Sequence, residues 1–323
     1  MGKRIEWIDN ARGFCLLFVM AHHTSLAETW IVKVYLPIFL TLFFFISGFL
    51  FVNPDKDTSV SQKMLNILTS LLMPYCLYCV ITAVFHLLSG GVEAFLCDIR
   101  ISLLGVKSWF ISALVVTELL GVLMLINKKY SITLCVMYLL LSFAIYACLP
   151  YQEYFWNFRN AMFANVYFAI GMMCRYHNIV SHFIKNKVGF PLLCVYACLV
   201  MVDITDNVNV GNFNETFSNY PFFIMESLFG ISGFIWLCSK INRGNKSILF
   251  IGTNSLLYYY FQSVFIRITM AIFRKLGLHT SNTVDMCLVL LITCLGIAVL
   301  VNLINKHFPV FSGKYRIIIT GHR

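Results

Sequence analysis

Apolar runs of about 20 residues follow one another along the whole chain, separated by short connections rich in Gly, Pro, Asn and charged residues. A helix of about this length crosses the ~30 Å hydrocarbon core of a bilayer. The pattern predicts ten membrane-spanning helices, at residues 12–29, 32–52, 65–88, 109–127, 131–149, 163–177, 189–205, 220–239, 248–272 and 285–306. No constant repeat appears, so residues 1–323 are predicted to form one all-α, polytopic transmembrane helical bundle.

The composition supports this interpretation, because 59% of the 323 residues are hydrophobic and only 12% are charged. Soluble domains are about half apolar and about a quarter charged. No small-residue cleavage site follows the charged head of the chain, so the first apolar run is expected to be a span rather than a signal peptide. The 12 cysteines fall mostly inside apolar runs, without a second Cys-x-x-Cys motif or a His cluster, and no metal site is predicted.

The basic residues predict the orientation of the spans. Most of them lie near the two ends of the chain or in alternate connections, such as Lys56, Lys63, Lys128, Lys129, Arg175, Lys185, Lys187, Lys240, Arg243 and Lys246. The other connections hold fewer, namely Lys33, Arg100, Lys107, Arg159, Arg274 and Lys275. Because cytoplasmic loops carry the excess of Lys and Arg, both termini are expected in the cytoplasm. The net charge of +10 is therefore a topology signal, and no nucleic-acid partner is expected.

The first apolar run, DNARGFCLLFVMAHH from Asp9 to His23, has ionisable residues at both ends. At about 100° per residue, Arg12 and His23 lie on one helix face, with Asp9 one turn before Arg12. His22 points roughly 80–100° away from that face. With Arg12 at the cytoplasmic boundary, His23 is expected near the bilayer midplane, where an ionisable group usually has a function. The alternative is a neutral imidazole hydrogen-bonded between helices.

Other charged residues inside or beside the spans allow two interpretations each. Arg267 with Glu118 or Glu226 is predicted to form a buried structural pair, in preference to a catalytic role. Arg159 follows the aromatic segment YFWNF, Tyr154 to Phe158, and is a candidate contact for a sugar or lipid headgroup. An interfacial aromatic belt explains Trp156 equally well.

These residues resemble the membrane O-acyltransferases of acyltransferase family 3. The resemblance rests on Asp9-x-x-Arg12-Gly13, on His23 and on FFFISGFL, from Phe43 to Leu50. It continues through LLMPYCLY at 71–78, SWFISAL at 108–114, NVYFAIGMM at 165–173 and IGTNSLLYYYFQ at 251–262. Within the family the chain is most similar to the fucose 4-O-acetylase-like branch.

The resemblance implies transfer of an acyl group, usually acetyl from acetyl-CoA as co-substrate, to a hydroxyl of a glycan or lipid-linked sugar at a bacterial cytoplasmic membrane. A neutral imidazole can accept the hydroxyl proton. The implied catalytic residues are His23, Asp9 and Arg12. The implied donor contacts are Arg12, Lys63 and Ser47, and the implied acceptor or oxyanion contacts are His22, Trp109 and Gln262. Arg159 joins the acceptor contacts because of its place after the aromatic segment. No bound cofactor is expected, membrane lipid is an expected partner, and a homodimer is one possible assembly.

Two departures from the family pattern leave other readings open. The family often has an Arg-x-x-Arg pair after the second span, where residues 53–64 offer only Lys56 and Lys63, and often has His at the position of Gln262. Either difference implies another donor arrangement or lost activity, as in a non-catalytic partner of a glycan synthase. A transporter or flippase would use a midplane histidine to carry protons, but no inverted repeat is visible.

Overall fold

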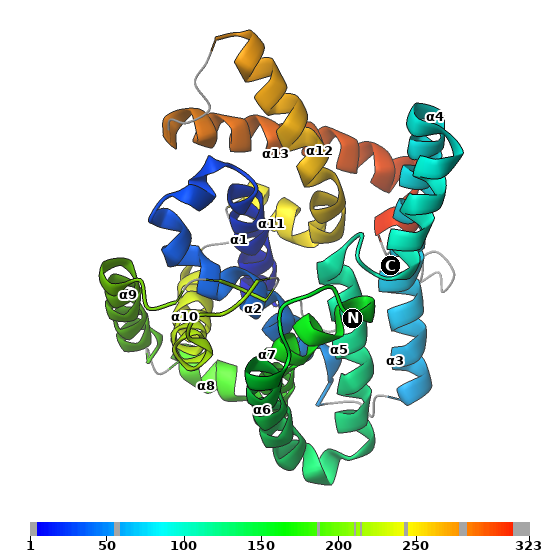
Figure 1. Ribbon diagram of the computed structural model, residues 1–323. Helices are drawn as coiled ribbons and strands as arrows, with labels where there is room; N and C mark the ends of the chain where they lie inside the picture. The colour runs from blue at the N-terminus through cyan, green and yellow to red at the C-terminus, as the bar shows by residue number, and fades with distance from the viewer. Residues whose placement is uncertain are drawn as a thin grey trace. The chain divides into compact units, whose positions relative to one another are not determined.

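The computed structural model describes residues 5–54, 59–185, 188–209, 211–213, 215–241, 245–277 and 283–312, and all regular structure in these ranges is helical (Figure 1). The predicted all-α class is therefore confirmed. By contacts the chain divides into two compact units, each assembled from segments that are distant in sequence. Unit 1 comprises Met1–Phe43, Ser181–Val210 and Pro221–Phe308, and unit 2 comprises Phe44–Val180, Gly211–Tyr220 and Pro309–Arg323.

The helices are labelled as in Figure 1. Unit 1 contains α1 (Glu6–His22), the first part of α2 (Ile31–Phe51), α9 (Gly189–Asp206), nearly all of α10 (Tyr220–Lys240), α11 (Lys246–Thr253), α12 (Ser255–Lys275) and α13 (Thr283–His307). Unit 2 contains the rest of α2, then α3 (Val60–Ile67), the π-helical turn η2 (Leu68–Leu72), α4 (Met73–Leu103), α5 (Trp109–Ile126), α6 (Ser131–Cys148) and α7 (Phe158–Tyr176). The short α8 (Ile179–Lys185) follows α7.

Eight helical stretches of the described chain are long and apolar enough to cross a membrane. They are Ile31–Phe51, Val60–Leu103, Trp109–Ile126, Ser131–Cys148, Gly189–Asp206, Tyr220–Lys240, Ser255–Lys275 and Thr283–His307, and each overlaps one predicted span. The protein is therefore a multi-pass membrane protein. The other two predicted spans fall on α1, which has 17 residues, and on α7, which carries two arginines and two asparagines. The total of ten spans and the cytoplasmic position of both ends stay predictions.

The first predicted span is misplaced along the chain. Its helix, α1, begins at Glu6 and ends at His22, whereas the hydrophobic pattern placed it at 12–29. Thr24 explains the early end, because its hydroxyl donates to the Ala21 carbonyl at 2.7 Å and accepts from the Leu26 amide at 3.3 Å. A side chain that bonds to a carbonyl of the last helical turn and also to the next turn favours a helix end at this point.

Glycines at two helix crossings explain several landmark segments of the sequence. In unit 2, a Cβ on Gly48 of α2 would clash with the Phe168 carbonyl of α7, and one on Gly171 would clash with the Phe45 carbonyl. In unit 1, Gly13 of α1 and Gly252 of α11 similarly approach the carbonyls of Ile248 and Asp9. Small residues allow such close backbone contact between membrane helices. The FFFISGFL and NVYFAIGMM segments therefore pack directly on each other.

The α4 helix is folded back on itself at Gly91, where φ is 74° and ψ is −165°. Glycine adopts this backbone conformation without the penalty that a Cβ imposes. The two arms lie against each other, since the Tyr75 hydroxyl donates to the Ser102 carbonyl at 2.6 Å and Thr82 Oγ1 lies 3.3 Å from Asp98 Oδ2. A helical hairpin therefore replaces the predicted loop after residue 88.

Candidate active-site residues

The end of α1 places two imidazoles in different surroundings. His22 is the last residue of the helix and is half-buried, whereas His23 is the C-cap residue and is exposed. Their ring centroids are 6.3 Å apart. His23 thus lies at the very end of the helix. The misplaced span had implied a position within it. The exposed ring of His23 is accessible to a substrate, and the ring of His22 is packed.

Aromatic rings of α1 and α2 form the packing around His22. Its centroid lies 5.6 Å from that of Phe39 and 6.3 Å from that of Tyr35, and Phe18 stacks on Tyr35 at 5.4 Å. The buried His22 Nδ1 atom and the buried Tyr35 hydroxyl have no hydrogen-bond partner. Buried polar atoms without partners are rare and often mark functional sites. This end of α1 therefore offers polar groups that can bind a ligand.

Asp9 and Arg12 lie in the first half of α1. Asp9 is buried, Arg12 is half-buried, and the close packing of α1 on α11 at Gly13 and Gly252 fixes this part of the helix. At 1.5 Å rise per residue, Arg12 and His23 are roughly 16 Å apart along the helix axis. Arg12 and His23 therefore cannot contact the same small group, and each must act at its own end of α1.

Gln262 and Glu226 are buried in unit 1 with unsatisfied oxygens. Gln262 of α12 is 3% exposed and Glu226 of α10 is fully buried, and neither the Gln262 Oε1 atom nor the Glu226 carboxyl has a hydrogen-bond partner. The predicted buried pair of Arg267 with Glu226 is wrong, because Arg267 is exposed and donates from Nε to the Ser263 carbonyl at 3.2 Å. Arg267 lies about two turns before the end of α12, and its long side chain extends outward to an exposed position. Glu118, the other predicted partner, is half-buried on α5.

An ion pair near Glu226 was not predicted. Lys33 Nζ lies 3.0 Å from Asp203 Oδ2 and also donates to the Asn209 carbonyl, while the Asn209 amide donates to Asp203 Oδ1 at 2.7 Å. The Asp203 carboxylate and the Lys33 ammonium both interact electrostatically with the Glu226 carboxyl. This polar group ties the start of α2 to the end of α9.

Two cations of unit 2 lie over phenyl rings at the end of α2. Lys63 Nζ is 4.5 Å from the centroid of Phe51, and Arg175 Cζ is 4.9 Å from that of Phe49. The buried Nε atom of Arg175 has no hydrogen-bond partner. Arg175 had been counted only as a topology charge. The structure brings it to the same helix end as the predicted donor contact, Lys63.

Ser47 and Trp109 belong to different parts of unit 2. Ser47 is half-buried on α2, directly before the crossing at Gly48. Trp109 is the first residue of α5, is half-buried and packs edge-to-face on Phe110 with centroids 6.1 Å apart. Neither position tests the role that the resemblance implies.

Arg159 lies in the first turn of α7 and is 2% exposed. Its guanidinium carbon is 4.9 Å from the Phe163 ring and 5.6 Å from the Tyr151 ring, and Nη1 donates to the Glu215 carbonyl at 3.3 Å. Its Nε atom has no hydrogen-bond partner. Among the residues that the structure describes, no carboxylate forms an ion pair with it. The guanidinium is held by rings and one carbonyl, without a counter-charge.

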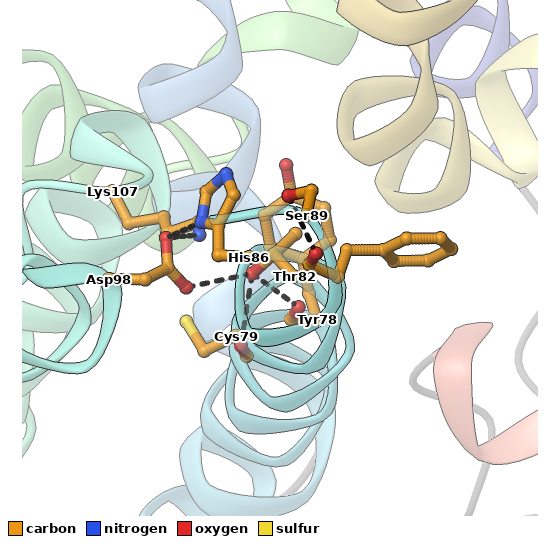
Figure 2. A network of polar contacts seen from close by, with 8 residues as sticks. Tyr78, Cys79, Thr82, His86, Ser89, Asp98 and Lys107 are labelled. Carbon is orange, nitrogen blue, oxygen red and sulfur yellow. Dashed lines mark hydrogen bonds and ion pairs between the residues drawn. The ribbon is translucent and has the colours of Figure 1, made fainter. Parts of the chain in front are cut away.

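A polar network joins the two arms of α4, as Figure 2 shows. Asp98 is buried and accepts from Lys107, from Thr82 at 3.3 Å and from His86, whose Nδ1 lies 2.9 Å from Oδ1. A buried carboxylate that accepts several hydrogen bonds compensates for its lost hydration. The Gly90-Gly91 pair was the sequence signal for this hairpin. The network stabilises the turn, while His86 itself stays half-exposed.

The fold and these residues define a class of protein. Helices of membrane-spanning length that hold buried ionisable side chains are typical of membrane proteins with chemistry inside their helical region. A family model described as an acyltransferase domain matches residues 5–302. The chain belongs to this acyltransferase family, as the resemblance to acyltransferase family 3 had predicted, and it is an integral-membrane acyltransferase. No curated protein and no solved structure matches the chain.

Proposed function

We propose that this acyltransferase moves an acyl group, acetyl in the simplest case, from acyl-CoA to a hydroxyl of a cell-surface or lipid-linked glycan. The family match over residues 5–302 supports acyl transfer as the reaction. The accessible imidazole of His23, beside the unsatisfied polar atoms of His22 and Tyr35, is the observation that carries the choice of a hydroxyl acceptor. The proposal also includes membership of the fucose 4-O-acetylase-like branch and location in the bacterial cytoplasmic membrane.

His23 acts as the general base in this scheme. Its neutral imidazole takes the proton from the acceptor hydroxyl as the oxygen attacks the thioester carbonyl, and the proton then passes to the departing CoA thiolate. The developing oxyanion needs hydrogen-bond donors, for which His22 and Gln262 of unit 1 are the candidates. Asp9 orients Arg12 one turn further along α1. The net result is an ester on the acceptor and free CoA.

The donor phosphates bind to basic residues on the predicted cytoplasmic side. Lys63 lies over the ring of Phe51 and Arg175 over that of Phe49, both in the last turn of α2, and Ser47 lies in the turn before them. Arginine binds phosphate oxygens through two parallel N–H groups, whereas lysine acts as a point charge. Arg175 thus supplies a guanidinium that the segment after α2 lacks. Arg12 is proposed as the donor contact from α1.

The test uses inside-out membrane vesicles that contain the protein and acetyl-CoA labelled in its acetyl group. We expect label to enter the glycan fraction with the wild-type chain and to stay in the donor with His23→Ala. A matched variant, Ser89→Ala, removes a hydroxyl from an exposed position of α4 and should transfer normally. Absence of transfer with acetyl-CoA and succinyl-CoA alike, in vesicles that hold folded protein, would contradict the proposal.

A further inference from the structure

The position of Arg159 is electrostatically unfavourable without a ligand. The residue is almost fully buried, and no acidic residue lies in the first turn of its helix, α7. The amino end of a helix carries the positive end of its dipole and favours anions, so a cation there is repelled. A buried charge needs a partner to offset the loss of its hydration. Two aromatic faces and one carbonyl offset only part of this cost, and an anion is the missing partner.

The backbone before Arg159 is held in an uncommon conformation. Trp156 and Asn157 have φ of 50° and 51°, a left-handed geometry that Asn tolerates but that is strained for the bulky Trp156. Asn157 Nδ2 donates to the Gly105 carbonyl and to Ser112 Oγ, both at 2.9 Å, and the Trp156 indole donates to the Leu103 carbonyl at 3.1 Å. These bonds fix the aromatic segment at the start of α7, and strained residues are typical of ligand-binding positions.

The same aromatic segment lines a hollow of 590 Å³ in unit 2. Leu72 of η2 and Val115 and Leu119 of α5 line it together with Tyr154, Trp156 and Phe158. Its volume is in the range of small-molecule sites, and its walls are almost entirely apolar. Val115 and Leu119 lie about 9 to 15 Å along α5 from Trp109, so the hollow extends into the membrane-spanning part of that helix.

We propose that this hollow binds the hydrocarbon chain of a phosphate-bearing membrane lipid, and that the lipid phosphate pairs with Arg159. The apolar hollow accounts for the chain and the uncompensated guanidinium accounts for the phosphate. Phe158 lines the hollow and directly precedes Arg159 in the first turn of α7, so the lipid would run from the hollow over this turn to the guanidinium. The lipid would carry the acceptor sugar. This last statement rests on the proposed function, whereas the binding site itself does not.

The ring of Tyr151 covers the guanidinium and is itself 45% exposed. Rotation of this exposed side chain is part of the proposed binding, because the phosphate needs access to the guanidinium. The carboxyl of Glu215 is exposed, although its backbone carbonyl accepts from Arg159. If Glu215 were the counter-charge, no anion would be needed, and the experiment therefore includes a Glu215→Gln variant.

The experiment measures binding in phosphatidylcholine nanodiscs, with a long-chain alkyl phosphate that carries a photoreactive diazirine near the end of its chain. Cross-linked residues are mapped by mass spectrometry. We expect labelling within 115–119 or 154–158 that unlabelled alkyl phosphate suppresses, and that neither the matching alkyl alcohol nor inorganic phosphate suppresses. Arg159→Gln should weaken binding about tenfold or more, since a charge-assisted pair is lost.

Matched variants separate the proposal from simple misfolding. Leu119→Trp fills the hollow from an exposed position and should abolish labelling, whereas Leu123→Trp, one turn further along α5 and equally exposed, should not. Arg100→Gln removes an exposed arginine of unit 2 and Glu215→Gln removes the nearby acid, and both should leave binding unchanged. Leu119→Trp keeps the test decisive if Arg159→Gln fails to fold.

Several outcomes would overturn the proposal. Equal suppression by the alcohol would show an apolar site without phosphate recognition, and equal suppression by inorganic phosphate would show a site for a free anion. A wild-type dimer that Leu119→Trp dissociates would show that a second copy covers the hollow. Loss of binding in Glu215→Gln would also contradict it. Binding is measured without acyl-CoA, so a negative result leaves acyl transfer standing, and failed acyl transfer leaves binding standing.

Discussion

The two histidines at the end of α1 differ in their surroundings although they are adjacent in sequence. His22 lies among the rings of Phe39 and Tyr35, and its Nδ1 atom is buried, whereas His23 is exposed. The helix end causes this difference, because the backbone of His23 leaves the helix at the C-cap. A packed histidine and an accessible one should respond differently to the same substitution.

His23→Ala should lower acyl transfer by about 10²- to 10⁴-fold, the range expected for loss of a general base. His22→Ala should keep measurable activity but lower the melting temperature, because packing against Phe39 is lost. The wild-type rate should rise with pH as the base loses its proton. The measurements are the transfer rate across pH and thermal unfolding of each purified variant. Normal transfer by His23→Ala would contradict the assignment.

Lys63→Ala and Arg175→Ala should each raise the KM for acyl-CoA and change kcat little, if both residues bind the donor equally in ground and transition states. Arg175→Lys should restore only part of the affinity, since the guanidinium fork is lost. Lys129→Ala is the matched control, because Lys129 also lies over a ring, that of Tyr130 at 5.6 Å, on the same predicted membrane side. The measurement is steady-state kinetics at varied acyl-CoA concentration. Equal KM values for all three Ala variants would refute the donor site.

At the scale of helices, the glycine crossings explain why certain motifs occur together. Gly48 and Gly171 bring α2 and α7 into backbone contact, and Gly13 and Gly252 do so for α1 and α11. The Arg12-Gly13 motif thus combines a residue of proposed function with a packing residue. Packing of α1 against α11 fixes the position from which Asp9 and Arg12 act.

Gly48→Ala and Gly171→Ala should each destabilise the protein by about 1–3 kcal/mol, the usual cost of overpacking against rigid backbone. The neighbouring Leu50 is 41% exposed, so Leu50→Ala should change stability much less. Thermal unfolding in one detergent, at equal protein concentration, gives the comparison. A Gly48→Ala protein as stable as Leu50→Ala would show that α2 and α7 do not approach this closely.

At the scale of the whole molecule, hydrophobic periodicity predicted the membrane helices well because lipid requires long apolar helices. It misplaced α1, since the stop at Thr24 depends on side-chain hydrogen bonds within an apolar stretch. It also missed the second arm of α4, because the charges of Asp98 and Arg100 are typical of a loop. In the structure Lys107 and His86 pair with Asp98, which allows this segment to be helical.

The candidate site was less predictable for a related reason. Residue type and spacing made His22 and His23 candidates, because their polarity stands out in an apolar run, and the family resemblance added Lys63. Contacts between distant segments, such as Lys33 with Asp203 or Arg175 with Phe49, depend on which helices are neighbours. The wrong Arg267–Glu226 pair has the same origin, because a sequence does not show which faces of two helices meet.

The most direct test of acyl transfer to a glycan is mass spectrometry of the glycans of cells that express the wild-type chain, His23→Ala or neither. We expect glycans heavier by one acyl group only with the wild-type chain, and unmodified glycans in the other two, at equal amounts of membrane-inserted protein. Glycans that change in amount or location with no change in mass, or that gain the acyl group with His23→Ala, would contradict it.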